Sequence, residues 1–165
     1  MSSTVIDKIR QYLTFRLEEE IFGVDVAQVR EILDYIKVTK VPRMPDFMCG
    51  VINLRGSVVP VVDMRIKFGM NKVEATVDTC IIVVDVNLEG EATTLGALVD
   101  SVQEVFELEP AEIEAAPRLG TKLRTEFIKG MGKRNEMFII LLDIDKIFSS
   151  EELEIINESS DTIKN

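Results

Sequence analysis

The residues that could perform catalysis are few and lack the bases that they would need. Ser57 and Ser101 are candidate nucleophiles, but the sequence contains no histidine, which removes the commonest general base and every Ser–His pair. Asp63, Asp143 and Asp145 could imitate a metal cluster. Asp63 and Asp143, however, each stand where a helix N-cap is expected, and capping is the commoner role there. We therefore expect no catalytic residue and no metal site.

Two other patterns also fall short of a chemical site. The segment Gly130-Met131-Gly132-Lys133 is a lone G-x-G and lacks the rest of a phosphate-binding fingerprint. Cys49 and Cys80 have no C-x-x-C spacing and stand among apolar residues, so we expect buried free thiols rather than a disulfide or a metal pair. Acidic residues are numerous enough for a glycosidase-like pair, but nothing brings two of them together. The sequence therefore implies no cofactor and no enzyme.

Composition and charge narrow the class further. A chain of 165 residues that is 46% hydrophobic and 29% charged suits one folded domain, or two small lobes sharing a core. A net charge of −10 opposes binding to nucleic acid or to an anionic membrane surface. The longest apolar runs are far shorter than the roughly 20 residues that span a bilayer. The first residues also lack the basic and apolar stretches of a secretory signal, so we expect a cytoplasmic protein.

Alternating apolar and polar residues predict a mainly β protein. Leu13, Phe15 and Leu17, for example, fall on one face of a strand, with polar side chains between them. The expected strands cover residues 10–17, 21–24, 36–41, 51–54, 58–62, 79–86, 93–99, 102–108, 127–132 and 136–142. Residues 70–78 have the composition of a linker.

Short helices are expected where an aspartate can cap them. Asp25, with Gln28 three residues later, predicts a capped helix over residues 25–33. Its apolar stripe would consist of Val26, Val29, Ile32 and Leu33. Shorter helical segments are expected over residues 46–49, 64–68 and 143–148.

The two halves of the chain resemble each other. The pattern Phe-x-x-Gly, Val-Val-x-Val-Val-Asp and Phe over residues 47–68 returns as Phe-x-x-Gly, Phe-Ile-x-Leu-Leu-Asp and Phe over residues 127–148. Upstream, Gly-x-x-Val-x-x-Val over residues 23–29 is echoed over residues 96–102. A repeat of about 80 residues favours two similar small barrels over a single sandwich. Chance likeness between generic strand–helix units is the alternative.

One charged residue stands out as a candidate for recognition. Arg55 is next to Gly56 at the tip of a predicted hairpin, where its guanidinium would be exposed and could form a forked pair with a carboxylate. A solvated surface arginine is the simpler alternative. Because an exposed ion pair contributes only about 0–1 kcal/mol to folding, an arginine here would matter more for binding than for stability.

Four blocks of the sequence resemble the CheW family of chemotaxis coupling proteins. They cover residues 12–32, 41–63, 96–102 and 141–147, in the order expected for the family, and the most specific part reads Gly50-Val51-Ile52-Asn53-Leu54-Arg55-Gly56. The resemblance implies a mainly β fold of two five-stranded, SH3-like barrel lobes on a shared hydrophobic core, with short helices. The expected domain covers residues 8–150, with lobes over 18–75 and 76–150 and a strand over 9–17 that the lobes could share. We expect residues 151–165 to form a flexible acidic tail.

The resemblance also implies a function. A CheW-like protein is a non-catalytic adapter that joins the cytoplasmic tip of methyl-accepting chemoreceptors to a CheA-type histidine kinase, within receptor arrays at the membrane. The receptor-side candidates are Val29, Glu31, Ile32, Gly50, Asn53 and Arg55, with Arg55 and Glu31 as a surface pair. Val38 and Lys40 are candidates for the kinase-binding surface. Self-association into rings is left open, and no direct insertion into the membrane is implied.

Four other kinds of protein are alternatives to a free-standing chemotaxis adapter. The regulatory domain of the kinase shares this fold, but the chain has no ATP-binding segment and no phosphotransfer histidine. An adapter fused to a receiver domain would need further sequence. A CheW-like scaffold could serve another chemosensory output, such as pilus-based motility. A barrel that binds a small ligand or a nucleic acid is the remaining class, and the acidic charge opposes its nucleic-acid form.

Overall fold

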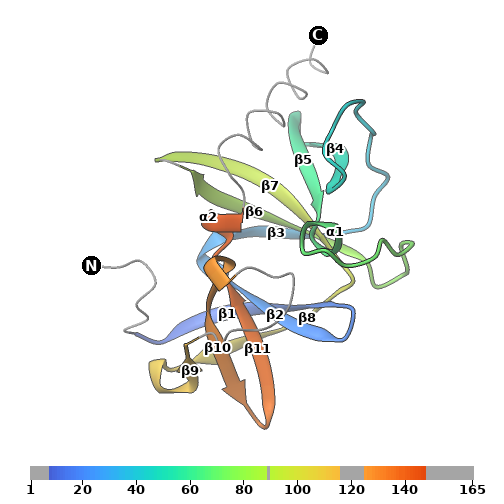
Figure 1. The fold of residues 1–165 in the computed structure, drawn as a ribbon. Helices are drawn as coiled ribbons and strands as arrows, with labels where there is room; N and C mark the ends of the chain where they lie inside the picture. Colours follow the sequence, from blue (N-terminus) through green and yellow to red (C-terminus); the bar gives the residue numbers. More distant parts are fainter. Residues whose placement is uncertain (1–7, 89, 116–124, 148–165) are drawn as a thin grey trace.

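The fold is described from a computed structural model, which covers residues 8–88, 90–115 and 125–147. Two antiparallel-rich sheets lie one above the other, with the short helices α1 (Met64–Lys67) and α2 (Ile144–Ile147) between them (Figure 1). The mainly β fold with two curled sheets confirms the predicted fold class. The acidic tail expected over residues 151–165 lies outside the described residues.

Each sheet combines strands from both halves of the chain. One sheet has six strands in the order β8-β1-β2-β11-β10-β9, and the other has five in the order β3-β6-β7-β5-β4. The six strands are β1 Arg10–Leu17, β2 Glu20–Asp25, β8 Ser101–Leu108, β9 Ile113–Glu114, β10 Ile128–Arg134 and β11 Met137–Leu142. The five are β3 Val29–Asp34, β4 Met48–Leu54, β5 Ser57–Asp63, β6 Cys80–Leu88 and β7 Glu91–Val99.

Both sheets curl into barrels because a chain leaving one edge strand returns to the opposite edge. After β3, Thr39 forms a two-hydrogen-bond bridge with Val51 of β4, both bonds being 2.9 Å long. After β8, the chain passes through the 3₁₀ turns η2 (Pro110–Glu112) and then pairs as β9 with β10 at the other edge. We refer to the two bodies as the five-stranded barrel and the six-stranded barrel.

The structure shows that the repeat is real and that it does not coincide with the barrels. The Asp63 amide donates to the Phe47 carbonyl at 2.7 Å, and the Asp143 amide donates to the Phe127 carbonyl at the same distance. A bulge precedes Gly50 in one hairpin and Gly130 in the other. The first unit (β1 to α1) and the second unit (β6 to α2) are thus equivalent. Each gives its first two strands to one barrel and its later strands to the other.

This exchange differs from the lobes expected over residues 18–75 and 76–150. The five-stranded barrel is the continuous stretch from β3 to β7, whereas the six-stranded barrel joins β1 and β2 to β8–β11. The sequence repeat indicates the unit that is duplicated. It cannot indicate which barrel each strand joins, since that depends on pairing between distant strands.

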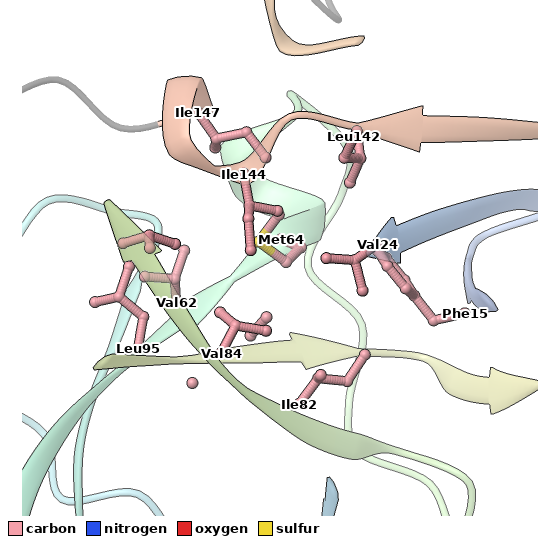
Figure 2. A pocket seen from close by; sticks show the side chains of 13 residues that line it. Phe15, Val24, Val62, Met64, Ile82, Val84, Leu95, Leu142, Ile144 and Ile147 are labelled. Atoms are coloured by element: carbon pink, nitrogen blue, oxygen red, sulfur yellow. The ribbon is translucent and has the colours of Figure 1, made fainter. Parts of the chain in front are cut away.

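A shared apolar core joins the barrels. Phe15, Phe22, Phe68 and Phe127 form a row of rings with centroids 5.7–6.4 Å apart, drawn from both units. Figure 2 shows further apolar side chains converging from both sheets and from α2 around a cavity of about 20 Å³. A space of this size holds little more than one water, and apolar cavities of this kind stay dry. The region is therefore packing rather than a ligand site.

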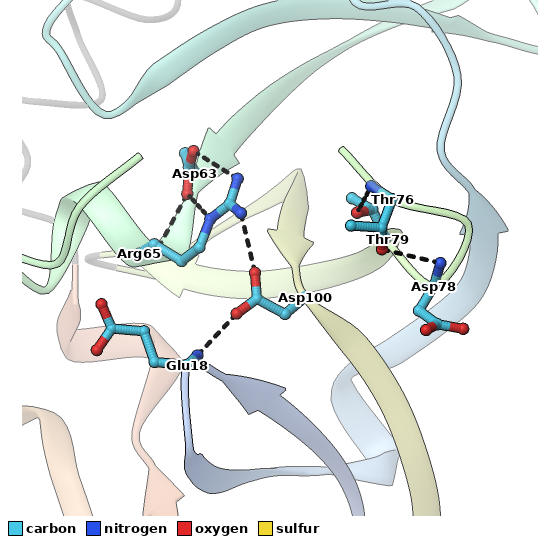
Figure 3. Close-up of polar contacts among 7 residues, drawn as sticks. All are labelled: Glu18, Asp63, Arg65, Thr76, Asp78, Thr79 and Asp100. Atoms are coloured by element: carbon cyan, nitrogen blue, oxygen red, sulfur yellow. Dashed lines mark hydrogen bonds and ion pairs between the residues drawn. The ribbon is translucent and has the colours of Figure 1, made fainter. Parts of the chain in front are cut away.

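A buried ionic cluster fastens the two barrels beside this core (Figure 3). Arg65 of α1 is 2% exposed, and its guanidinium binds both carboxylate oxygens of Asp63, at 3.0 and 3.1 Å. Its remaining terminal nitrogen donates to Asp100 at 2.9 Å. Asp100 in turn accepts from the Glu18 amide in the β1–β2 turn, at 2.7 Å. The cluster therefore connects α1, the crossing from β7 to β8, and the far hairpin of the six-stranded barrel.

Three predicted local structures are wrong. Asp25 does cap, because its carboxylate accepts from the Ala27 amide at 2.9 Å, but the cap begins only the 3₁₀ turn η1 (Val26–Gln28). Residues 29–34 form β3 instead of continuing a helix, since their pairing with β6 outweighs a short amphipathic stripe. Residues 46–49 are not a helical turn, because β4 begins within them, and of residues 36–41 only Thr39 is paired.

Two glycines in the same hairpin give a matched test of backbone packing. A Cβ at Gly50 would lie 2.0 Å from the Thr39 carbonyl oxygen, whereas a Cβ at Gly56 would meet nothing within 4 Å. Both have positive φ, so each alanine carries a conformational cost of about 1–2 kcal/mol. In urea unfolding, we expect the free energy of unfolding to fall by about that much in Gly56→Ala. In Gly50→Ala we expect it to fall by more than about 3 kcal/mol. Equal losses would mean that the backbone at Thr39 moves aside to admit the added methyl group.

Candidate functional site

The β4–β5 hairpin presents Arg55 on a rigid tip. Its two-residue loop consists of Arg55 at φ 50 and Gly56 at φ 86, the left-handed pair of a type I′ turn. The Asn53 side-chain oxygen accepts from the Gly56 amide at 2.9 Å and so fixes the loop from below. The expected hairpin and its exposed arginine are confirmed, and the role of Asn53 is to shape the tip.

Arg55 forms a forked ion pair with Glu31 across the mouth of the five-stranded barrel. One guanidinium nitrogen lies 3.5 Å from Glu31 Oε2, and the other contacts Oε1. The Arg55 side chain is 73% exposed and the Glu31 side chain 26%. A pair this open contributes little to folding, but it presents an oriented charge to an incoming partner.

A bulge places Glu31 for this pair. The pairing register of β3 with β6 shifts between Val29 and Glu31. The side chains before and after this shift therefore contact different parts of the molecule. Val29 is half-buried against the shared core, whereas Ile32 is 45% exposed. Beside them, Arg30 pairs with Asp85 at 2.8 Å.

The structure brings most of the receptor-side candidates together but gives Gly50 a different position. Glu31, Asn53 and Arg55 are linked through the hairpin tip, and Ile32 adjoins Glu31 on β3. Gly50 is buried under the Thr39 carbonyl. Its position accounts for the glycine through backbone packing, without any partner.

The kinase-side candidates Val38 and Lys40 lie on either side of the Thr39 bridge. Val38 packs against the interior of the five-stranded barrel, and Lys40 is exposed. Both line a cleft of about 520 Å³ between the chain after β3 and the chain after α1. Nothing in the sequence pointed to this cleft, since its walls are two irregular loops that become neighbours only in the fold.

Cys49 lines the same cleft and is poorly suited to reaction at neutral pH. Burial, followed by the nearby Asp63 carboxylate, raises the pKa of Cys49 to about 11, against the opposing effect of Lys72 and Arg65. Both cysteines are free thiols, as predicted, although each is half-buried rather than fully enclosed.

Arg65 is the residue that sequence reasoning missed. Charged side chains are almost never fully buried unless they are paired, so an arginine beside Asp63 gave no reason to expect burial. The only available signal was its position two residues after an expected cap, where its side chain can fold back onto the capping carboxylate.

The described residues offer a binding surface and no evident reaction centre. Among residues 8–88, 90–115 and 125–147, no group of three Cys, Asp or Glu side chains could hold a metal ion. None of the helices in these ranges has the length and apolar character that crossing a membrane requires. Two interlocked barrels with an exposed, oriented ion pair define a small β protein with a rigid surface suited to recognition.

Comparisons with known proteins identify the family. The profile of the CheW-like domain matches residues 11–152. "Chemotaxis protein CheW" of Klebsiella aerogenes is 37% identical, covering 90% of this chain and 87% of that protein. The protein of the same name from Rhizobium meliloti is 34% identical, covering 88% of this chain and 91% of that protein.

A solved structure agrees. The scaffolding protein TtCheW from Thermoanaerobacter tengcongensis superposes with a TM-score of 0.76 at 33% identity, covering 87% of this chain and 94% of that chain. The chain belongs to the CheW family, and it is a non-catalytic scaffold rather than an enzyme. The predicted resemblance is confirmed, and a ligand-binding barrel is not favoured.

The raised pKa of Cys49 can be tested through alkylation. Because only the thiolate reacts, a pKa near 11 instead of 9.0 should slow the reaction of Cys49 with iodoacetamide at pH 8 about a hundredfold relative to the unfolded chain. The rate should keep rising about tenfold per pH unit up to about pH 11. Mass spectrometry after quenching separates Cys49 from Cys80. A plateau below pH 9.5 would show that the thiol is not held in a desolvated site.

Proposed function

We propose that this protein couples chemoreceptors to a CheA-type histidine kinase in chemotaxis signalling. The observation that carries the proposal is the forked Arg55–Glu31 pair at a rigid barrel tip, in a chain of the CheW family. Such an adapter needs no reactive group. It needs surfaces that hold two partners in a fixed relation, and the interlocked barrels supply that rigidity.

The receptor-side surface would combine the charged tip with the exposed part of β3. Ile32 offers apolar area, and Arg55 with Glu31 offers charges that fix the register of a helical partner. Asn53 would act through the shape of the turn, and Val29 would act from below the surface. Gly50 would act only by allowing the barrel to close.

The kinase-side surface would include Val38 and Lys40, on the segment that closes the five-stranded barrel. This segment pairs with Val51 in β4, whereas Arg55 follows the end of the same strand. The adapter could therefore contact both partners at once.

Each contact would be weak, and assembly would provide the strength. A surface of a few exposed side chains supports affinity of the order of micromolar. Many adapters held in one receptor array at the membrane would gain through avidity. Association of adapters with one another in rings would increase this effect.

The direct test is kinase autophosphorylation with receptors in membrane vesicles, with and without this protein. We expect a steep rise in phosphate incorporation only when kinase, receptor and adapter are all present, and suppression by attractant. Bovine serum albumin at equal concentration is the control. If the protein binds neither kinase nor receptor in pull-down and leaves the rate unchanged, the proposed coupling is wrong.

The ion pair can be tested by reversal and exchange of its charges. Arg55→Glu places two carboxylates together at the tip, and we expect it to weaken receptor binding at least about tenfold, as loss of about 1.4 kcal/mol would. Folding should change by less than about 1 kcal/mol because the pair is exposed. The double variant Arg55→Glu with Glu31→Arg should form the ion pair again with its charges exchanged, and it should recover part of the receptor binding. Loss of the fold in Arg55→Glu would make the residue structural instead.

A further inference from the structure

The cleft beside Lys40 gathers cationic side chains in a protein that is acidic as a whole. Besides the buried and paired Arg65, the cleft is lined by three cationic side chains, namely Lys40, Arg43 and Lys72. None of them forms an ion pair or a side-chain hydrogen bond with another described residue, in a protein whose net charge is −10. Most other arginines of the described residues are paired with carboxylates. The cleft therefore collects unpaired positive charge on an acidic molecule.

Besides Asp63, two acidic side chains line the cleft, but they do not cancel this charge. Asp46 and Glu74 face it, and no ion pair joins either of them to the three cations. Asp63 and Arg65 also line the cleft, but they are buried and paired with each other. The unpaired lining charges thus leave an excess of one positive charge.

Apolar side chains line the cleft together with these charges. Tyr35 is 43% exposed and Val73 is 46% exposed, and Met44 and Leu98 contribute to the walls. At about 520 Å³, the cleft lies within the range of roughly 300–1,000 Å³ that is usual for ligand sites. A simple inorganic anion would use the cations and leave the apolar walls exposed. A peptide that carries both carboxylates and apolar side chains would use both.

We propose that this cleft binds an acidic segment of a partner protein, one in which glutamate or aspartate alternates with apolar side chains. The carboxylates would pair with Lys40 and Lys72, and the apolar side chains would cover Tyr35 and Val73. The inference deepens the proposed function, because Val38 and Lys40 are its kinase-side candidates. The experiment below uses neither kinase nor receptor, so its failure is distinct from failure of coupling.

Cys49 provides a reporter inside the cleft. In a Cys80→Ser background, the rate of alkylation by anionic iodoacetate is divided by the rate with neutral iodoacetamide. A cation about 8 Å from a thiol raises such a ratio about twofold at the dielectric constant of water, and Lys72 is close enough to lower the pKa of Cys49. We expect Lys40→Gln with Lys72→Gln to lower the ratio at least about twofold at 20 mM NaCl, and much less at 500 mM, where charges are screened. Lys129→Gln with Lys133→Gln, on β10 outside the cleft, removes the same net charge and is the matched control.

Peptide protection then tests the occupant. A short peptide of alternating glutamate and leucine should slow iodoacetamide at Cys49 at least about threefold, as about 0.7 kcal/mol of net binding would, and its glutamine counterpart should not. Inorganic phosphate at matched ionic strength should give no protection. The proposal is overturned if the glutamate peptide does not protect. It is also overturned if phosphate protects equally, which would make the cleft a small-anion site, or if both charge variants lower the ratio alike.

Discussion

The architecture depends on an exchange of strands between two equivalent units. β1 and β2 complete a barrel whose other strands arise after residue 100, while β6 and β7 complete the barrel begun by β3–β5. Each parallel contact is short: β5 meets β7 at three residue pairs, and β11 meets β2 at two. At both places a glycine, Gly96 or Gly23, lies in the contact and admits a branched side chain from the neighbouring strand. The exchange is therefore specified by packing as well as by backbone pairing.

The ionic cluster around Arg65 secures this exchange at the point where the chain crosses between barrels. Asp100 stands at that crossing and binds Arg65 on one side and the Glu18 amide on the other, while its own amide donates to the Arg16 carbonyl at 3.1 Å. A buried cation requires such complete pairing, because desolvation would otherwise cost several kcal/mol. The Arg55–Glu31 pair is the opposite case, open to solvent and available to a partner. Arginine–carboxylate pairs thus hold the barrels together in one place and present exposed charge in another.

Local patterns in the sequence predicted what depends on local structure. The hairpin that carries Arg55 and the cap at Asp63 follow from turn and capping residues close in the chain, and both are present. β3 was predicted as a helix because Val29, Ile32 and Leu33 suit a helical stripe equally well, and its partner β6 lies about 50 residues away. The burial of Arg65 and the cleft at Lys40 depend on loops that meet only after folding. The family resemblance supplied the pairing of Arg55 with Glu31, which spacing alone could not give.

The intertwined topology has a consequence for synthesis on the ribosome. β1 and β2 emerge first, yet the strands that flank them, β8 and β11, follow more than 75 residues later. At about 5–20 residues per second, this hairpin waits several seconds with Phe15, Leu17 and Phe22 uncovered. The stretch β3–β7 can close its barrel while the first hairpin is still unpaired. Nascent chains of this fold therefore pass through a partly folded state in which the first hairpin exposes apolar side chains. A holding chaperone would act on this hairpin.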